Sequence, residues 1–407
     1  MLVSLALRNL ARNRRRTALE LMIVGAGAAS LLLTAGYVRD SFNGMQEAFI
    51  RGGLGHLEVA PASAAEAAGP DRASQPSFVD WSGRRRDIEA LPHVVGATGA
   101  IVMHGLVSQG ERTLPFVGAG VETDREQRMG LRIAVRSGAP LLLAAPPEGE
   151  ESVLLGLGLA RQLATGVGDV VTLTAFSRDG MLNALDVRVV GLVTTGVQEL
   201  DLRFVRMHLA TAQRLLATDA VSSVVVMLDD TEHTGALRDA IGQSMGTQYD
   251  VSDWQDRAPF YGQVRALYWG IFTFLGSVVL VLVCLSSSNT LLMAVMERTR
   301  EIGALLAMGT SAGQVVRMIV LEAIWLGLIG GVLGSGTGFV IAALIHALHV
   351  ELPPPPGAVD RMQLQLQFVA WDPVWVTALM MAILALAAAV PAWRVLRLRI
   401  VEALNHV

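Results

Sequence analysis

The residues of this sequence most able to do chemistry lie between positions 296 and 309, where charged side chains interrupt long apolar stretches. Apolar runs at residues 267–295 and 315–348 flank the segment. A short helix between two runs of membrane length has to lie at the water–lipid boundary. Its charged residues are Glu297, Arg298, Arg300 and Glu301. We expect Glu297 and Glu301, one helical turn apart, to share a face of the helix.

Small residues make up much of what remains of the segment. They are Gly303, Ala304, Ala307 and Gly309. Such positions leave the backbone nearly bare, and a bare backbone allows close docking against another protein. The alternative is an amphipathic loop at the interface that only turns the chain. Composition alone leaves both interpretations open.

Most enzymatic chemistry is excluded or unsupported. The chain has no lysine, so all 32 basic residues are arginine, and a Walker A loop requires its lysine to hold the phosphates of ATP. The eight histidines are scattered without metal-ligand spacing, and His346 with His349 looks like a pair at a membrane edge. A net charge of −4 argues against nucleic acid as a partner. We therefore predict no catalytic site, metal or cofactor in this chain.

The composition, 52% hydrophobic and 17% charged, is typical of a membrane protein. Four transmembrane helices are predicted, at residues 18–39, 267–295, 315–348 and 373–393. A cleavable signal peptide at the start is the alternative for the first. We prefer a membrane helix, because the apolar run is long for a signal peptide and lacks a clean cleavage site.

Arginine placement predicts the orientation. Five arginines precede the first span in the amphipathic segment 1–17, and three more lie in the tail 394–407. The loop 349–372 contains only Arg361. By the positive-inside rule, both termini and the charged segment 296–314 face the cytoplasm. The region 40–265 is then extracytoplasmic.

Residues 40–265 have the pattern of an α+β domain. Strand-like runs occur at residues 56–60, 97–107, 153–155, 170–175, 185–193 and 223–228. A strand–helix–strand pattern opens the region and a second one closes it. These predict two halves of a porter-like α/β subdomain, with a β-rich subdomain inserted at residues 116–216. Asp179-Gly180 is a strong hairpin signal within the insertion.

Two features of the predicted membrane helices favour close packing. Small residues form one ridge of Gly327, Gly331 and Ser335 and a second ridge of Gly330, Gly334 and Gly338. Ridges of this kind let helix backbones approach in lipid, either within one subunit or across a dimer. Glu322 is the only acidic residue well inside a span, and we expect it to make a polar contact near the cytoplasmic end.

Apolar stripes also continue beyond the membrane. The first stripe consists of Phe42, Met45 and Phe49, and the second of Phe260, Val264 and Leu267. The stripes could line a cleft that takes a lipid-like anchor from the outer leaflet. Packing of the two helices against each other is the alternative.

Several segments resemble one known family. The run ERTREIGALLAMGTS, followed by Glu322 and a glycine-rich helix, is similar to the signature of MacB/FtsX-like ABC transporter permeases. VLLGLGLARQLATGVGDVVTL and VRVVGLVTTGVQELD resemble the middle of their external domain. The tail resembles theirs too, but has Arg399-Ile400 where relatives usually have Asp-Pro. MHGLVSQGERTLPFVGAGVETDRE and the missing Walker lysine favour the lipoprotein-releasing (LolC/LolE-like) branch.

The resemblance implies a function. It makes residues 296–309 a coupling helix that docks on a cytoplasmic ABC ATPase dimer, which would supply ATP and Mg²⁺. Its expected contact residues are Glu297, Arg298, Arg300, Glu301, Gly303, Ala307 and Gly309. A second permease subunit, identical or different, would complete the transporter in the bacterial inner membrane.

The resemblance also suggests what the transporter handles. It would release lipoproteins or similar amphiphiles from the membrane lipids. The hairpin at Arg178, Asp179 and Gly180 would then contact a periplasmic carrier. Efflux through a periplasmic adaptor and activation of a periplasmic hydrolase are the alternatives.

Overall fold

The computed structural model describes residues 14–62, 78, 81–144, 146–177, 179–195, 198–352 and 362–397. It divides into two compact units. Among the described residues, the membrane unit comprises residues 14–43, 264–352 and 363–397, and the α/β domain is built on those between 44 and 263. The predicted tail 394–407 is described only as far as residue 397.

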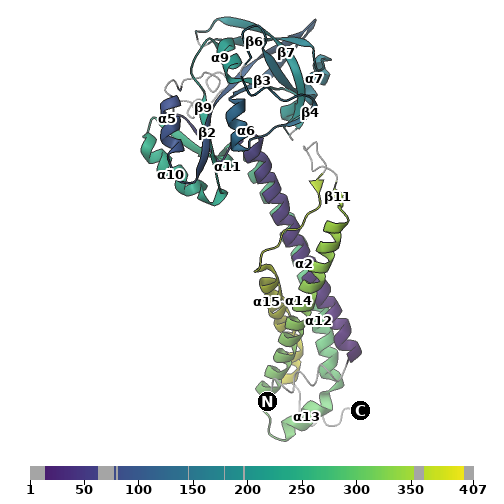
Figure 1. The fold of residues 1–407 in the computed structure, drawn as a ribbon. Coiled ribbons are helices and arrows are strands. Elements are labelled where there is room, and N and C mark those ends of the chain that lie inside the picture. Colours follow the sequence, from purple (N-terminus) through teal and green to yellow (C-terminus); the bar gives the residue numbers. More distant parts are fainter. Residues whose placement is uncertain are drawn as a thin grey trace. The chain divides into compact units, whose positions relative to one another are not determined.

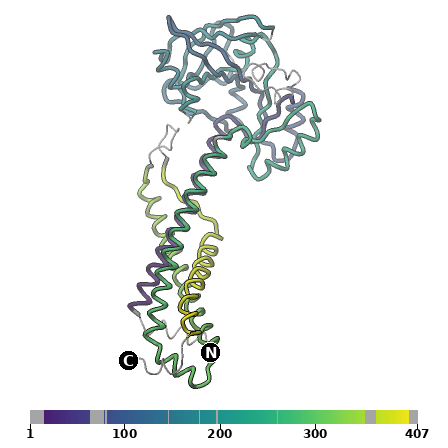
Figure 2. The backbone as a smooth tube through the Cα atoms, turned by 180° about the vertical axis from the view of Figure 1, so that it is seen from behind, coloured from purple at the N-terminus to yellow at the C-terminus, as the bar shows by residue number. Residues whose placement is uncertain are grey.

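The membrane unit contains the four predicted spans. Its helices are α2 (Arg14–Phe49), α12 (Pro259–Glu297), α13 (Thr299–Ala307), α14 (Ala312–Ala347), α15 (Asp372–Ala387) and α16 (Ala389–Leu396), and β11 (Glu351–Leu352) pairs with β12 (Met362–Gln363). Within the described residues, α2, α12, α14 and the α15–α16 pair are each long and apolar enough to cross a membrane. Figures 1 and 2 show these helices side by side.

One apolar core joins the helices of this unit. It includes Val24 and Leu32 of α2, Val283 of α12, Ala323 of α14 and Met380 of α15. Ile302 of α13 belongs to the same core and is only 4% exposed. The charged segment is therefore packed against the spans by its apolar face.

The α/β domain is organised on one ten-stranded sheet. The strands are β1 (Leu57–Pro61), β2 (Val94–Gln109), β3 (Arg112–Val121), β4 (Ala134–Gly138), β5 (Ser152–Gly156), β6 (Val170–Phe176), β7 (Leu182–Thr194), β8 (Phe204–His208), β9 (Ser223–Leu228) and β10 (Tyr249–Asp253). Their order is β10-β1-β9-β2-β3-β8-β5-β7-β4, and β6 pairs with β2 and β7.

Short helices connect these strands. They are η1 (Ile50–Leu54), α5 (Trp81–Glu89), α6 (Thr123–Met129), α7 (Leu157–Leu163), α8 (Gln198–Asp201), α9 (Leu209–Leu216), η2 (Thr231–His233), α10 (Thr234–Met245) and α11 (Trp254–Arg257). Figure 1 shows α5 and α10 near β2 and β9.

The two ends of the domain sequence form one subdomain. β1, α5 and β2 come from the first end, and β9, α10 and β10 from the second. The order β10-β1-β9-β2 alternates the two halves, and each neighbouring pair is antiparallel. This is the split β-α-β arrangement. Each half pairs its strands with the other half, so neither half forms this sheet alone.

The β-rich part begins earlier than residue 116, which falls inside β3. Strand β2 serves both parts. Its first half pairs with β9 up to Ala100, and Leu106–Ser108 pairs with β6. The sheet runs on without a break because nothing in the 16 residues of β2 ends the strand.

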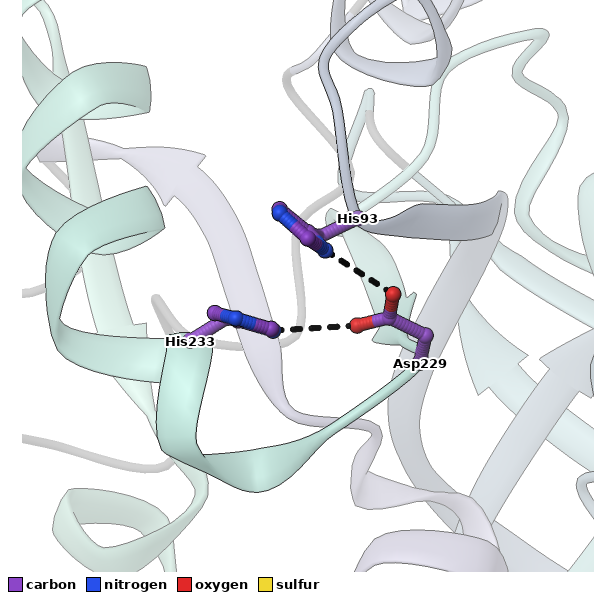
Figure 3. Close-up of side chains that lie close together, drawn as sticks. All are labelled: His93, Asp229 and His233. Atoms are coloured by element: carbon purple, nitrogen blue, oxygen red, sulfur yellow. Dashed lines mark hydrogen bonds and ion pairs between the residues drawn. The ribbon is translucent and has the colours of Figure 1, made fainter.

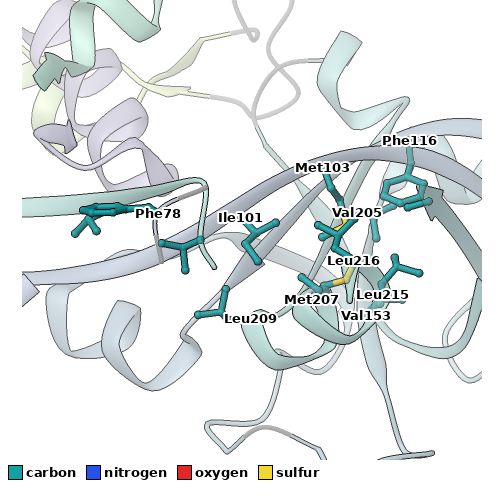
Figure 4. Close-up of a cluster of buried hydrophobic side chains, with 14 of the residues drawn as sticks. Phe78, Ile101, Met103, Phe116, Val153, Val205, Met207, Leu209, Leu215 and Leu216 are labelled. Carbon is teal, nitrogen blue, oxygen red and sulfur yellow. The ribbon is translucent and has the colours of Figure 1, made fainter. Parts of the chain in front are cut away.

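The larger of the apolar cores in the described part of this domain packs against the sheet (Figure 4). It contains Ile101 and Met103 of β2, Phe116 of β3, Val205 of β8 and Leu215 of α9, each at most 2% exposed. Full burial of such side chains stabilises the fold by roughly 1.5–3 kcal/mol each. The core therefore holds the inserted strands and the split subdomain together.

Candidate functional site

The charged segment is divided by a break at Arg298. Helix α12 ends at Glu297, Arg298 has φ −102° and ψ 12°, and α13 begins at Thr299. The Thr299 hydroxyl donates to the carbonyls of Val295 and Met296, at 3.1 and 2.8 Å. Such side-chain bonds to the preceding turn compete with helix continuation. Glu297 and Glu301 therefore belong to two different helices instead of one, and both residues are exposed.

A second turn follows α13. Gly309 has φ +94°, a conformation that favours glycine. The N–H of Thr310 donates to the Leu305 carbonyl at 3.1 Å, which closes the end of the helix. Ser311 and Gln314 then form a capping box at the start of α14. The segment is thus a separate helix with a defined start and end.

The two faces of α13 differ. The buried residues are Thr299, Ile302 and Gly303. The exposed residues of α13 and the turn after it are Arg300, Glu301, Ala304, Ala307, Met308 and Gly309. The expectation that Gly303 lies on the docking surface is wrong, since its phase on the helix turns it inward. Met308, 75% exposed, is an apolar residue that the prediction left out of this surface.

Ion pairs connect the start of the segment to the other helices. Arg298 lies 3.7 Å from Glu322 of α14, and both side chains are at most 15% exposed. Arg16 of α2 lies 3.0 Å from Glu297, whose side chain is 60% exposed. Solvent screens the exposed Arg16–Glu297 pair. The Arg298–Glu322 pair therefore contributes more to holding the segment against the bundle. Glu297 and Arg298 thus contact the bundle.

The first glycine ridge of α14 packs on α15. A methyl group at Gly331 would lie 2.9 Å from the Cα of Thr377, and one at Gly327 would lie 2.7 Å from the Cα of Met381. Both distances are shorter than real Cβ atoms show, so these two positions accept only glycine at this backbone spacing. The ridge is therefore used within one subunit.

The second ridge packs on α2. A methyl group at Gly334 would come within 2.4 Å of the Gly25 carbonyl oxygen, and one at Gly330 within 2.6 Å of Val24. Gly338 contacts Leu32 of the same helix. The sequence left open whether the ridges pack within one subunit or across a dimer. The structure shows contacts within the chain for both ridges.

The sequence analysis missed an ion pair between α2 and α15. Arg39 binds Asp372 with two guanidinium nitrogens, one of them Nη2 at 3.0 Å from Oδ1. Asp372 also accepts from the Val369 N–H at 2.7 Å and from Trp375 Nε1 at 3.2 Å. Its side chain is 3% exposed. Each residue lies at the edge of an apolar run, which is the only sequence signal for the pair.

In the membrane unit, Leu267 of the predicted stripe lies off the face of α12 that contacts α2. Phe42 contacts Tyr268 with ring centroids 6.2 Å apart, and Tyr37 contacts Phe272 at 5.8 Å. Leu267 is 60% exposed instead. Most residues of this helix are apolar, so hydrophobic spacing did not select the face that meets α2.

The remaining stripe residues differ in their contacts and burial. In the α/β domain, Phe49 contacts Tyr261 with ring centroids 6.3 Å apart. Met45 and Val264 are partly buried. The side chain of Phe260 lies outside the described set. The described aromatic contacts are packing contacts between α2 and α12.

Within the α/β domain, the entering and leaving chain segments are joined. Arg257 of α11 lies 2.6 Å from Glu58 of β1 and donates to the Leu54 carbonyl at 2.8 Å. The N–H of Trp254 donates to the His56 carbonyl at 3.1 Å. We call these contacts the collar. The collar makes the two ends of the domain one rigid element.

The predicted hairpin joins β6 and β7, with Phe176 opposite Leu182. Gly180 has φ +77°, and its N–H donates to the Ser177 carbonyl at 2.9 Å. Arg178, one of the predicted contact residues, lies outside the described residues. Three side chains at the tip are largely exposed, namely Phe176 (69%), Met181 (71%) and Leu182 (65%). The tip is therefore an apolar surface on a rigid strand pair.

The fold also brings together residues that the sequence analysis treated as scattered (Figure 3). His93 Nδ1 lies 2.9 Å from one oxygen of Asp229, and His233 Nδ1 lies 3.1 Å from the other. The two rings stack with centroids 3.8 Å apart. A hydrogen bond from His93 is the largest cause of the lowered pKa of Asp229. Spacing along the sequence did not show this grouping, because His93 lies far from Asp229 and His233 in the chain.

Comparison with known proteins identifies both units. Residues 17–244 match the MacB-like periplasmic core domain, and residues 272–400 match the FtsX-like permease C-terminal family. The chain is 26% identical over 330 residues to "Lipoprotein-releasing system transmembrane protein LolC" of Xylella fastidiosa strain Temecula1. That match covers 77% of this chain and 78% of the relative.

Further relatives match smaller parts. The macrolide export ATP-binding/permease protein MacB of Escherichia coli is 27% identical, over 33% of this chain and 22% of its own length. The solved periplasmic region of MacB from Actinobacillus actinomycetemcomitans aligns at 13% identity and a TM-score of 0.37, covering 52% of this chain and 94% of that region. With the four spans, the family matches show that this bacterial membrane protein belongs to the MacB/FtsX-like family of ABC transporter permeases.

Proposed function

We propose that this chain is a permease subunit that converts ATP hydrolysis by a separate ATPase into movement of its α/β domain. The observation that carries the proposal is the two-faced helix α13. Its buried face belongs to the core of the spans, while Arg300, Glu301 and Ala307 are exposed. A helix with this division can receive a push on one face and pass it to the bundle through the other.

The contacts around α13 support transmission over a distance. The Arg298–Glu322 pair and the core residue Ile302 fix the helix to the bundle. Helices α2 and α12 both continue past the last membrane-unit residues into the α/β domain sequence. In that domain the collar joins the segments that follow α2 and precede α12. Movement of these helices would therefore act on the domain as a whole.

Two substitutions on the exposed face of α13 test the coupling. In Glu301→Arg and Ala307→Trp, we expect ATPase stimulation by the permease to fall roughly tenfold, because about 1.4 kcal/mol of lost docking suffices for that change. The matched controls are Asp239→Arg and Ala240→Trp, at exposed positions on α10 of the α/β domain. ATP turnover by the co-purified ATPase in nanodiscs is the measurement.

The proposal fails if both α13 variants retain full stimulation and co-purification. Gly303→Trp is not a suitable variant, because Gly303 is buried and the indole would disrupt packing. Loss of stimulation in the α10 controls as well would indicate a general defect in folding.

A second permease subunit would complete the transporter. α12 is the least covered of the four spans, with 11% of its apolar window buried against 33–39% in the others. Lipid or another subunit has to cover this face. We propose a dimer formed along α12, and crosslinking between cysteines placed at Leu282 in two copies would detect it. Crosslinks between copies only at exposed positions of other helices would contradict it.

The orientation follows from the same scheme. The α13 segment and both termini face the cytoplasm of the inner membrane, and the α/β domain is periplasmic. A reporter active only outside the cytoplasm should work after Gly149, in an exposed turn, and stay silent after Gly309. An active fusion after Gly309 would contradict the coupling assignment.

For the substrate class, we propose lipoproteins or similar amphiphiles. The match to LolC extends over most of both chains, whereas the match to MacB covers a third of this chain. The exposed tip of Phe176, Met181 and Leu182 suits a carrier that accepts an acyl-modified protein. Burying such side chains would stabilise a complex by about 25 cal/mol per Å² of apolar surface.

Serine at all three tip positions tests the hand-over step. We expect extraction and ATP turnover to continue while transfer to a soluble carrier is lost. Leu142→Ser is the control, since Leu142 is equally exposed elsewhere in the domain. Efflux through an adaptor predicts a different result. The triple variant would lose adaptor binding, and neither the variant nor the unaltered chain would release lipoprotein. If the chain instead activates a periplasmic hydrolase, neither lipoprotein nor an efflux substrate should be released. The triple variant should then lose activation of the hydrolase.

A further inference from the structure

The cluster of His93, Asp229 and His233 shares no residue with the α13 segment or the collar. His93 is in the turn between α5 and β2, Asp229 follows β9, and His233 ends η2. The three ligand atoms all lie within 4.8 Å of one another. Each side chain is 40–49% exposed, so the cluster is open to ions from solvent. It joins the first and second halves of the split subdomain.

The backbone around the cluster is held in place. The Asp229 N–H donates to the His93 carbonyl at 3.1 Å. Asp230 caps η2 by accepting from the Glu232 N–H at 2.9 Å. The buried ring of His56 lies 3.1 Å from the Thr231 hydroxyl. The two connecting segments are therefore positioned independently of the three clustered side chains.

The arrangement of the side chains indicates a cation. Two imidazoles stacked at 3.8 Å present their Nδ1 atoms to the two oxygens of one carboxylate. Two imidazole nitrogens beside a carboxylate are a ligand set that Zn²⁺ accepts. Ligands of a tetrahedral ion at about 2.0–2.1 Å lie roughly 3.4 Å apart. The two nitrogen–oxygen distances, 2.9 and 3.1 Å, are within a small side-chain movement of that value.

We propose that His93, Asp229 and His233 form a binding site for a divalent transition-metal ion, with Zn²⁺ as the best fit. The ion takes the place of the two hydrogen bonds between the Nδ1 atoms and the carboxylate, and each neutral ring then carries its proton on Nε2. Water completes the coordination, because three protein ligands leave a position open. The bound ion crosslinks the α5–β2 turn to the β9–α10 connection and stabilises the split subdomain.

The test uses the full chain in nanodiscs, purified with a tag that contains no histidine. After treatment with a chelator and its removal, Zn²⁺ binding is measured by calorimetry, and Co²⁺ binding by its visible absorption. We expect one ion per chain. His93→Asn and His233→Ala should each raise the Kd roughly tenfold or more, since even residues behind metal ligands affect affinity that much. Asparagine is chosen because His93 has φ +67°.

Two matched controls define the outcome. His104→Ala removes an exposed histidine of β2 in the same domain, and His346→Ala/His349→Ala removes the other stacked pair. Both should bind as the unaltered chain does. Zn²⁺ should also raise the unfolding temperature of the unaltered chain and leave that of His233→Ala unchanged. The proposal is overturned if no ion binds, or if His93→Asn and His233→Ala bind as tightly as the controls.

Discussion

In the membrane unit, α14 meets α2 and α15 through glycines, whereas in the α/β domain the sheet meets its helices through large apolar side chains. The difference follows from the solvent. Water drives side chains such as Phe116 and Leu215 out of contact with it and into a core. Lipid provides no such drive, so helix contact depends on close backbone approach.

The two units also differ in the residues that they expose at these sites. The membrane unit presents the charged face of α13, while the α/β domain presents the apolar tip of the β6–β7 hairpin. A charged face remains well hydrated whenever its partner is absent. An apolar tip gains most from a partner that is itself apolar. Under the proposed function, charged residues would contribute to docking at α13 and apolar residues to docking at the hairpin tip.

The largest effect is expected from a side chain at Gly334. In Gly334→Leu the Cβ alone would overlap the Gly25 carbonyl oxygen, so α2 has to move away and the span core opens. Overpacking of this kind costs about 3 kcal/mol or more. Gly336→Leu is the control, because open space surrounds Gly336. Unfolding in a detergent titration measures the difference, and equal stability of the two variants would show that backbone approach is unimportant here.

An intermediate effect is expected from the buried ion pair of the α/β domain. Arg206 of β8 pairs with Glu126 of α6, and both residues are at most 6% exposed. Arg206→Ala leaves a buried carboxylate without its partner and should cost about 3 kcal/mol. Arg128→Ala breaks an exposed pair on the same helix, with Asp124, and should change stability by less than about 1 kcal/mol.

The pH dependence of this variant refines the test. Burial raises the pKa of Glu126 above its ordinary value, although Arg206 acts in the opposite direction. A raised carboxyl pKa in the folded state favours folding as the pH falls. Without Arg206 the pKa should rise further, so the variant should regain stability on acidification in a thermal unfolding series. Equal loss at all pH values would mean that Glu126 does not stay buried in the variant.

The smallest effect is expected from His56. The Leu228 N–H donates to its Nδ1 at 3.2 Å, and burial lowers its pKa. Because the unfolded chain binds the proton more readily, stability is present above the ordinary pKa of 6.5 and is lost as the pH falls below it. His56→Gln keeps an acceptor and should flatten the decline in unfolding temperature between about pH 7.5 and about pH 5.5. An unchanged slope would exclude His56 as its source.

Local sequence determined the features that depend on spacing along one element. Runs of apolar residues predict the four spans, the i, i+4 glycines of α14 predict two close-packing ridges, and Asp179-Gly180 predicts the hairpin turn. The strand–helix–strand patterns at both ends of the α/β domain also predict its split subdomain. In each case the physical cause acts within a few residues, by helix period, strand alternation or backbone conformation.

Only the tertiary structure decided which residues meet across elements. The face of α12 that contacts α2 had no signal in a helix apolar all round, and the inward position of Gly303 depends on where Thr299 restarts the helix. The Arg39–Asp372 pair joins residues 333 positions apart. His93 meets Asp229 and His233 only because β2 and β9 are neighbours in the sheet. Contacts of this kind arise from chain packing, which no single local pattern contains.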